Sequence, residues 1–454
     1  PYALKANPEC EMKVISPYYR VTRKGDHPVE KVKEIKGLRG FGDMGSFTLL
    51  RTVLDGVEFY FIDKEDYYDR DNLYGTPEGD YTDNARRFGF FSYAVLASMA
   101  ETGYYPDVIH ANDWETALIP LYRDLYIQKG DPLGKVKVLY AIHNLAYQGR
   151  FDREEVENIG LTEEYLEAIS HEGKINFMKA GILYSDAVST VSKKYAQEML
   201  TKEYGCGLEN VLHKRREVLY GILNGADYSK WNPETDKFIP ENYNRKTLDK
   251  KQVCKKELIK RMNINIPLDK PLLGSVGRLT GQKGIDIIVD SISHIVKAGA
   301  GLALLGTGEK RYEDALVGAG SGKKQIGISI GFDERLAHMI EAGSDMFILP
   351  SRYEPCGLNQ MYSLKYGTIP IVRATGGLDD TVIDYSLDQD RGNGFKFDNA
   401  DSPDFVSALE RAFALYEDKE AWRNLQRKGM SLDFSWNKSA QAYAALYRKL
   451  LEKT

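Results

Sequence analysis

A carboxylate and a glycine pair each follow a predicted strand in the carboxyl-terminal half of the chain. Glu354 comes after the apolar run at residues 345–349, and Gly376 and Gly377 come after the run at residues 369–372. Free amides at a helix N-terminus bind anions, because they lack intrahelical acceptors and the helix dipole adds positive potential. A glycine pair alone can equally make only a tight connection. With the carboxylate upstream, we interpret the turn as a candidate phosphate-binding site.

Two basic residues, Arg278 and Lys283, follow the predicted strand at residues 271–276 and precede a predicted helix. At the carboxyl end of a strand, their side chains can converge on a diphosphate and neutralise the charge that develops on a departing nucleotide. Basic residues in loops are usually only solvated. The position at a strand end favours the phosphate interpretation here.

Polar residues also follow two predicted strands in the amino-terminal half. His110 and Asp113 lie at the end of the run at residues 107–110, and His143 follows the run at residues 137–142. An isolated histidine is more often a packed core residue, but two of seven histidines at consecutive strand ends favour a polar site. A zinc site at His110 and Asp113 is the weaker alternative, because only one further ligand candidate is local.

Two further patterns predict no site. Gly40, Gly42 and Gly45 match G-x-G-x-x-G, but they follow a charged run and not an apolar strand, so a dinucleotide fingerprint is not expected. Asp69 and Asp71 have the D-x-D spacing of metal-dependent sugar transferases. A chain with 28% charged residues produces this spacing by chance, and we expect no metal there.

The elements that must position these residues are short apolar runs that alternate with helix-length segments. Such alternation implies parallel sheets covered by helices. A further run at residues 301–305 fits the pattern, and a polar stretch at residues 224–250 interrupts it. We interpret this stretch as the hinge between two doubly wound domains, whose ligand would bind at the carboxyl ends of the strands. The expected division is an N-terminal domain at residues 1–240, a C-terminal domain at 241–434, and a final helix at 435–454 that packs back toward the N-terminal domain.

Composition excludes several classes of protein. The length of 454 residues predicts two or three domains. No uninterrupted apolar run reaches the ~18 residues that a membrane-spanning helix needs, which indicates a soluble globular chain. A net charge of −5 without a basic tract argues against nucleic acid or a membrane surface as a partner. The four cysteines lack C-x-x-C spacing, which suggests a reducing compartment. The expected partner is a small molecule or a neutral polymer.

Motifs along nearly the whole chain resemble the starch and glycogen synthases of bacteria and plastids, which are retaining glycosyltransferases of the GT-B fold. Besides the segments above, the resemblance includes VISPYYR from Val14, GDYTDNARRFGFFSYAVL from Gly79, KINFMKAGILYSDAVSTVS from Lys174 and GILNGADYSKWNPETD from Gly221. It implies an α/β fold of two Rossmann-like, doubly wound parallel-sheet domains that face each other across a cleft. It also implies transfer of glucose from ADP-glucose to the non-reducing end of an α-1,4-glucan with retention, without a metal or another cofactor.

The resemblance also assigns roles to individual residues. Arg278 and Lys283 match the pair on the distal phosphate of the donor, and Glu354 matches the carboxylate that contacts the donor sugar. Phe332 stands where the family commonly has an aromatic residue that stacks on adenine. The other matching positions around the donor are Cys356, Gly357, Leu358, Thr375, Gly376, Gly377, Leu378, Asn224, Asp113, His143, His110 and Trp114.

Three departures from the related patterns are visible. Tyr362 replaces the second glutamate of the broader GT-B pattern, a departure that this synthase family shares. Asn112 replaces a second histidine found in many bacterial members, although plant-like members resemble HANDW. The glycine-rich K-x-G-G-L loop that the family places near its N-terminus is absent, and we expect the first strand and this loop to be missing between Tyr2 and Ala3.

Two alternative functions remain open at this stage. One is a relative that prefers UDP-glucose, and the other is a catalytically impaired glucan-binding homologue that lacks the donor loop. The expected location is cytoplasmic for a bacterial source and the plastid stroma for a plant or an alga.

Overall fold

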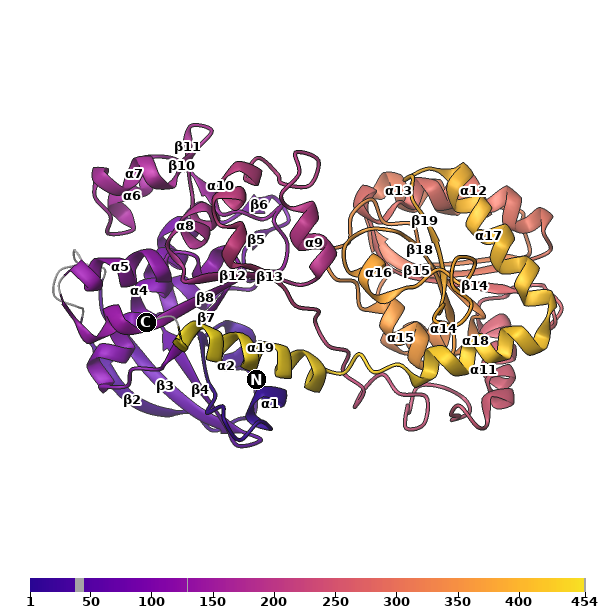
Figure 1. The fold of residues 1–454 in the computed structure, drawn as a ribbon, viewed down its shortest axis with the longest axis horizontal. Helices are drawn as coiled ribbons and strands as arrows, with labels where there is room; N and C mark the ends of the chain where they lie inside the picture. The colour runs from indigo at the N-terminus through magenta and orange to yellow at the C-terminus, as the bar shows by residue number, and fades with distance from the viewer. Residues whose placement is uncertain (37–44, 129, 453–454) are drawn as a thin grey trace. The chain divides into compact units, whose positions relative to one another are not determined.

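The protein is described here by a computed structural model, which covers residues 1–36, 45–128 and 130–452. Its chain forms two compact units (Figure 1). Unit 1 contains Pro1–Val191, Ala196–Ile222 and the residues from Ala440 onward, and unit 2 contains Ser192–Tyr195 and Leu223–Ser439. The division therefore falls after Ile222, upstream of the expected boundary at residue 240.

Unit 1 is built on a four-stranded parallel sheet with the strand order β13-β12-β8-β7. Its central strand β8, with the sequence KVLYAI, is buried from its second residue onward, as expected for a strand covered on both faces. The strands of this sheet are β7 (Val108–Asn112), β8 (Lys137–Ile142), β12 (Ala187–Thr190) and β13 (Leu219–Gly221).

A second four-stranded sheet in unit 1 has the order β1-β4-β3-β2. Only β1 and β4 are parallel, whereas β3 pairs antiparallel with both of its neighbours. The expectation of purely parallel sheets is therefore wrong for this part of the chain, because the turn Asp55-Gly56 joins β3 directly to β4. The strands are β1 (Lys13–Pro17), β2 (Glu30–Ile35), β3 (Phe47–Leu54) and β4 (Val57–Asp63).

Short strands and helices complete unit 1. The short strands are β5 (Gly75–Thr76), β6 (Gly79–Asp80), β9 (Arg150–Phe151), β10 (Ser170–His171) and β11 (Lys174–Asn176). The helices before residue 222 are α1 (Tyr2–Lys5), α2 (Arg20–Arg23), α3 (Glu65–Tyr68), α4 (Asn84–Thr102), α5 (Ile119–Gln128), α6 (Glu155–Asn158), α7 (Glu163–Ile169), α8 (Phe177–Tyr184), α9 (Lys193–Glu198) and α10 (Glu209–Lys214).

Unit 2 contains a six-stranded sheet that is parallel throughout, with the order β16-β15-β14-β17-β18-β19. The chain starts at the central strand β14, proceeds to one edge, and returns to β17 on the other side of β14. The order therefore reverses between β14 and β17, which is where ligands bind in open α/β sheets. The strands are β14 (Leu272–Leu279), β15 (Gly301–Gly308), β16 (Ile326–Ile330), β17 (Met346–Leu349), β18 (Ile369–Arg373) and β19 (Phe395–Phe397).

Helices cover both faces of this sheet. Successive residues of a strand point to opposite faces. Met346 and Ile348 accordingly pack in one apolar cluster with α12 and α17, whereas Phe347 and Leu349 pack in another with α11 and α14. The helices after residue 222 are α11 (Lys251–Arg261), α12 (Ile285–Lys297), α13 (Lys310–Gly320), α14 (Glu334–Gly343), α15 (Asn359–Lys365), α16 (Gly376–Thr381), α17 (Ser402–Glu417), α18 (Lys419–Ser431) and α19 (Trp436–Glu452), of which α19 lies mostly in unit 1. The parallel-sheet prediction is confirmed here.

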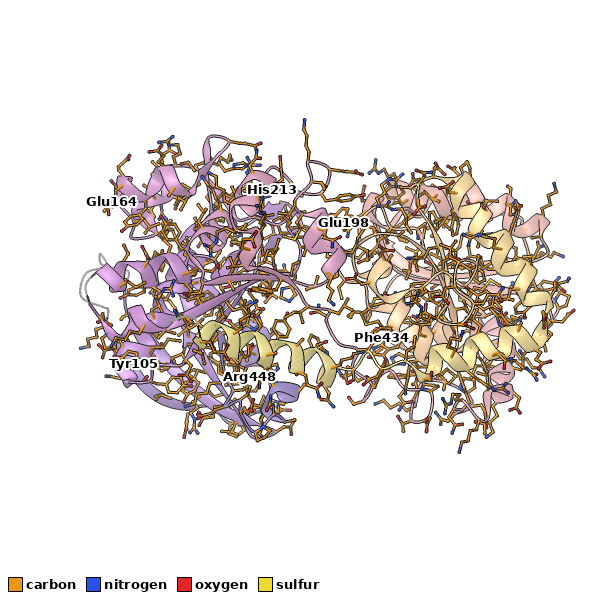
Figure 2. All side chains as sticks on the ribbon, in the orientation of Figure 1. Tyr105, Glu164, Glu198, His213, Phe434 and Arg448 are labelled. Atoms are coloured by element: carbon orange, nitrogen blue, oxygen red, sulfur yellow. The ribbon has the colours of Figure 1, made fainter. Side chains whose placement is uncertain are left out.

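The last helix, α19, packs its apolar residues on unit 1. Tyr443, Leu446 and Leu450 share a buried cluster with Leu139 of β8 and with Leu4. Arg448, labelled in Figure 2, forms an ion pair with Glu9. None of the described helices is long and apolar enough to cross a membrane.

The stretch at residues 224–250, interpreted above as a hinge, packs into unit 2. The Trp231 ring is stacked between His338 and Tyr362, with ring centroids 3.7 and 4.4 Å away. The Asp236 carboxylate lies 2.7 Å from Nδ1 of His338, and both side chains are buried. Tyr362, at the position of the missing second glutamate, therefore holds this stretch by stacking.

The chain begins with the short helix α1. Tyr2 and Ala3 are consecutive residues of α1, and the amide of Lys5 donates to the Pro1 carbonyl at 2.8 Å. The missing first strand and K-x-G-G-L loop stay a prediction.

The structure describes the D-x-D pattern rejected above, but only part of the G-x-G-x-x-G pattern. Asp69 and Asp71 both accept hydrogen bonds from Arg20, at 2.8 and 2.6 Å, so their spacing serves an ion pair. Gly40 and Gly42 lie outside the described residues.

Candidate active site

Arg278 and Lys283 lie at the point where the strand order of unit 2 reverses. Arg278 is exposed near the end of β14, and Lys283 ends the 3-10 turn η5 (Gly281–Lys283) that follows. Both residues line one small cavity, together with Gly277 and with Ser351 from the loop after β17. Two basic side chains at the carboxyl end of one strand, beside the point where the strand order reverses, can bind an anionic group there.

Glu354 in the loop after β17 faces Lys283. The Lys283 Nζ atom lies 2.5 Å from Oε2 of Glu354, and the Ser351 hydroxyl donates to the same oxygen at 3.0 Å. The carboxyl side chain is only 9% exposed, so it needs these partners to stay charged. The structure thus joins two of the residues that the sequence assigned to the donor site.

The glycine pair after β18 brings a second loop against Glu354. Gly376 has φ +46°, and a Cβ atom on it would lie 2.0 Å from the Glu354 carbonyl oxygen. A Cβ atom on Gly377 would lie 1.8 Å from the Cys356 carbonyl oxygen. Only glycine fits at either position, because the backbones of the two loops are in direct contact.

The amides of this turn are already used within the protein. Gly377 donates to the Glu354 carbonyl at 3.0 Å, and Leu378 donates to the Thr375 carbonyl at 3.1 Å. The sequence predicted a phosphate site made of free amides at this helix start. The close approach of the loops requires glycine at both positions, and the phosphate role of the turn stays a prediction.

Cys356 lies between these loops as a buried thiol. Burial raises the pKa of Cys356 to about 12, and the backbone of Asn224 forms a hydrogen bond with it. The thiol therefore stays protonated at neutral pH. This contact brings Asn224 beside the Glu354 loop, as the sequence-based assignment of both residues to one site requires.

The two residues after Cys356 turn the chain into α15. Gly357 has φ +68°, and Leu358, 37% exposed, precedes the first residue of that helix. Phe332 lies farther along the same edge of the sheet, after β16. Its ring is 92% exposed, which leaves its face available for stacking.

The polar residues of unit 1 lie at the ends of β7 and β8, which are adjacent and parallel. Asp113 Oδ1 accepts from the His143 amide at 2.8 Å, and Asp113 Oδ2 lies 2.9 Å from Nδ1 of the same residue. Asp113 has φ +55°, an uncommon backbone conformation for a residue other than glycine. The strand ends predicted from the sequence are thus confirmed, and they form one pair.

The Asp113–His143 pair favours the charged form of the imidazole and directs Nδ1 toward the carboxylate. Burial alone would lower the pKa of His143, but the Asp113 carboxylate 2.9 Å from Nδ1 outweighs it and raises the pKa. With Nδ1 directed at the carboxylate, Nε2 is the ring atom that remains to donate to a ligand.

Glu115, which sequence reasoning missed, lies two residues beyond Asp113 in the 3-10 turn η1 (Trp114–Thr116). Burial raises the pKa of Glu115 to about 7, with a further contribution from the negative charge of Asp113. The side chain also shares a hydrogen bond with Tyr74. A carboxylate directly after the HANDW segment was the available signal, but the sequence does not reveal its burial.

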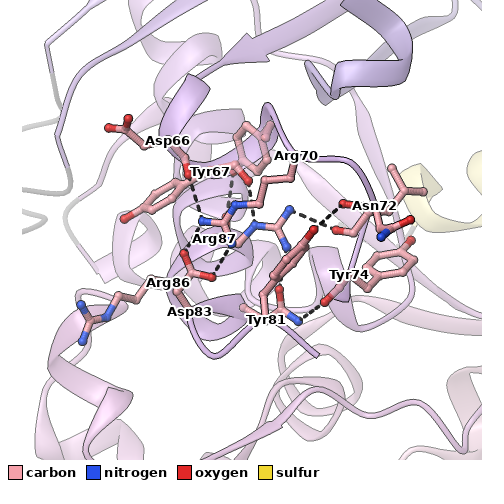
Figure 3. A network of polar contacts seen from close by, with 12 residues as sticks. Asp66, Tyr67, Arg70, Asn72, Tyr74, Tyr81, Asp83, Arg86 and Arg87 are labelled. Atoms are coloured by element: carbon pink, nitrogen blue, oxygen red, sulfur yellow. Dashed lines mark hydrogen bonds and ion pairs between the residues drawn. The ribbon is translucent and has the colours of Figure 1, made fainter. Parts of the chain in front are cut away.

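Buried Arg87 holds the loop that carries Tyr74 (Figure 3). Its Nε donates to the Tyr67 carbonyl at 2.8 Å and its Nη2 to the Leu73 carbonyl at 3.0 Å. Nη1 donates to the Asn84 side chain at 2.6 Å, and Asn84 in turn donates to the Tyr74 carbonyl at 2.9 Å. This network fixes the loop backbone beside Glu115 and its neighbours.

His110 and Trp114 serve mainly packing. The Nδ1 atom of His110 lies 2.8 Å from the Tyr447 hydroxyl of α19, and burial lowers the pKa of His110 to about 3, so the ring is neutral. Trp114 packs so closely on Gly149 that a Cβ atom there would lie 2.6 Å from the indole. Among the described residues, no group of three or more His, Cys, Asp or Glu side chains could hold a metal ion.

Comparison with known proteins gives consistent matches over both units. The family model described as "Starch synthase catalytic domain" matches residues 1–214, and the model described as "Glycosyl transferases group 1" matches residues 257–429. The chain is 42% identical to the glycogen synthase of Geotalea daltonii over 98% of this chain and 92% of that protein. It is 44% identical to the glycogen synthase of Koribacter versatilis over 97% and 91%.

Solved structures agree with this result. The catalytic domain of starch synthase IV from Arabidopsis thaliana, bound to ADP and acarbose, matches with a TM-score of 0.86 and 34% identity. The match covers 98% of this chain and 92% of that one. A sucrose-phosphate synthase from Thermosynechococcus elongatus shares the fold, with a TM-score of 0.59 at 17% identity.

Proposed function

This chain belongs to the starch and glycogen synthase family of glucosyltransferases, and from that premise we propose that its donor is ADP-glucose. In the proposed reaction the glucosyl group passes to the non-reducing end of an α-1,4-glucan with retention at the anomeric carbon. The ADP and acarbose bound to the similar starch synthase IV domain support both substrates. The bacterial relatives support a cytoplasmic location.

The observation that carries the proposal is the group Arg278, Lys283 and Glu354 at the switch point of the unit 2 sheet. We propose that the two cations bind the donor diphosphate, so that no metal is needed to neutralise it. Lys283 already faces Glu354 at 2.5 Å, so a phosphate that enters beside the carboxylate meets the ammonium group there. Phe332 offers an exposed ring for the nucleotide base.

In the proposed chemistry the acceptor hydroxyl attacks the anomeric carbon from the face of the leaving group. The bond from that carbon to the diphosphate oxygen breaks, the new glycosidic bond forms, and the hydroxyl proton passes to the leaving diphosphate. No protein nucleophile is required. Positive charge fixed at the diphosphate lowers the barrier, because negative charge develops on that group in the transition state.

We assign the Asp113–His143 pair to the sugar. The carboxylate orients the imidazole, so Nε2 can donate to a sugar hydroxyl, and the raised pKa of His143 keeps a larger share of the ring charged near neutral pH. A glucan-binding protein without catalysis has no need of a diphosphate site, which argues against the impaired homologue.

The test is to incubate the protein with glycogen and either ADP-glucose or UDP-glucose, and to measure release of the nucleoside diphosphate. We expect faster release from ADP-glucose, and an α linkage in the elongated glucan by NMR. Release that is faster from UDP-glucose would identify the alternative donor. No release from either donor would contradict the proposed activity and favour the glucan-binding homologue.

A further inference from the structure

The loops that carry Lys283 and Glu354 are joined by an arginine that has no assigned role. Arg352 lies two residues before Glu354, and both ends of its guanidinium are bound to the segment that carries Lys283. Its Nη1 and Nη2 atoms lie 2.7 and 2.6 Å from the two carboxylate oxygens of Asp286, and Nη1 also donates to the Gly281 carbonyl at 3.0 Å. Such a two-point bond fixes direction as well as distance.

Backbone contacts extend this connection. The Arg352 amide donates to the Gln282 carbonyl at 2.8 Å, and the Gln282 side chain donates to the Tyr353 carbonyl at 3.2 Å. Gly284 comes so close to the second loop that a Cβ atom on it would lie 2.0 Å from the Pro350 carbonyl oxygen. The two loops are thus bonded to each other on both sides of Lys283.

The bonded loops are held by a helix on one side and by a strand of the sheet on the other. Asp286 lies in the first turn of α12, and its pKa is lowered, chiefly by the hydrogen bond from Arg352. On the other side, buried Arg373 at the end of β18 donates to the Ser351 carbonyl at 2.9 Å and to the Arg352 carbonyl. The lysine and the glutamate are therefore held through Arg352 from helix α12 and from strand β18.

We propose that Arg352 is a positioning residue for the donor site, which keeps Lys283 at the place where the nucleoside diphosphate binds. The inference rests on the proposed function, because it takes Lys283 as a ligand of the diphosphate. The Arg352 and Asp286 side chains are 40% and 44% exposed. An ion pair this exposed contributes little to global stability, so its fixed geometry points to a role in the site.

The experiment measures the dissociation constant of ADP by calorimetry for the wild type, Arg352→Gln, Lys283→Ala and the double variant. We expect Arg352→Gln to weaken ADP binding by about tenfold. In the Lys283→Ala background the same change should have less than about a twofold effect, because the residue it positions is gone. Asp286→Asn, which keeps Arg352 but removes the charge of its partner, should also weaken ADP binding.

Arg391→Gln is the matched control, since Arg391 forms an exposed 2.6 Å pair with Asp388 elsewhere in unit 2. It should leave the ADP affinity unchanged. The thermal midpoint of Arg352→Gln should stay within about 3 °C of the wild type. A general loss of folded structure would lower the midpoint by more than this.

The outcomes separate the inference from its premise. If Lys283→Ala weakens ADP binding but Arg352→Gln does not, or weakens it equally in both backgrounds, the positioning role is refuted and the proposed function stands. If the wild type fails to bind ADP, or Lys283→Ala binds it as well as the wild type, the diphosphate site itself is wrong.

Discussion

Replacement of Arg278 by alanine separates catalysis from stability. The side chain lies at the exposed end of β14, where among the described residues its one hydrogen bond is a 3.4 Å contact with Gln282. An exposed change of this kind alters the free energy of unfolding by less than about 0.5 kcal/mol. The variant should therefore fold like the wild type.

The expected effect on catalysis is much larger. Loss of one donor that stabilises the transition state costs about 2.7–4 kcal/mol of activation free energy. At about 1.36 kcal/mol per factor of ten, this lowers turnover roughly 100- to 1,000-fold. Arg278→Lys should recover part of the loss, because it keeps a positive charge but not the two-point geometry of the guanidinium.

The assay is release of ADP from ADP-glucose with glycogen as acceptor, alongside urea unfolding of the same preparations. Arg391→Ala provides a control for the loss of an exposed arginine in unit 2. Turnover within about threefold of the wild type in Arg278→Ala would refute the argument that this side chain stabilises the leaving diphosphate. A matching loss of stability would instead indicate a structural role that we do not expect.

Three further predictions concern buried groups. Lys283→Ala leaves the Glu354 carboxylate without its cation. This variant should lose activity, and its free energy of unfolding in urea should fall by about 2 kcal/mol. The double variant with Glu354→Gln should regain the stability but not the turnover. Burial raises the pKa of Glu115 to about 7, so protonation of this carboxyl stabilises the folded state. This stabilisation is fully present below about pH 4.3 and is lost as the pH rises through 7. Glu115→Gln should therefore show a smaller fall in thermal midpoint between pH 5 and 8, and an equal fall would contradict the burial. Asp236→Asn weakens the buried pair with His338 and should cost about 2 kcal/mol in urea unfolding, whereas an unchanged midpoint would show that the pair is dispensable.

Much of the fold could be predicted from local sequence. The runs KVLYAI and PLLGSV were expected to be strands, and they form β8 and most of β14. Such strands are recognisable because a parallel sheet is buried on both faces, so its strands read as continuous apolar runs. Strands of the mixed sheet in unit 1, such as β2, were not predicted. The β2 sequence EKVKEI has only one buried residue and has the pattern of a polar segment.

The residues of the candidate site could be predicted from their types and from their positions at strand ends. The contacts between their side chains could not. The segments around Arg278, Lys283 and Glu354 were identified as one donor site, and the structure places Lys283 against Glu354. The contact of the glycine turn with the Glu354 loop could not be predicted, because the sequence does not show that this loop accepts a hydrogen bond from the Gly377 amide.

The sequence by itself determined the family, the parallel sheets and the strand ends that bear the chemistry, because these depend on local apolar pattern and on residue types at fixed spacing. Tertiary structure alone decided that Lys283 pairs with Glu354, that Arg352 joins their loops, and that the carboxyl of Glu115 is partly buried beside Asp113. Each of these depends on charge and burial supplied by residues from other elements. A pair 71 positions apart, such as Lys283 and Glu354, meets only when the strand order of the sheet brings two loops to the same edge.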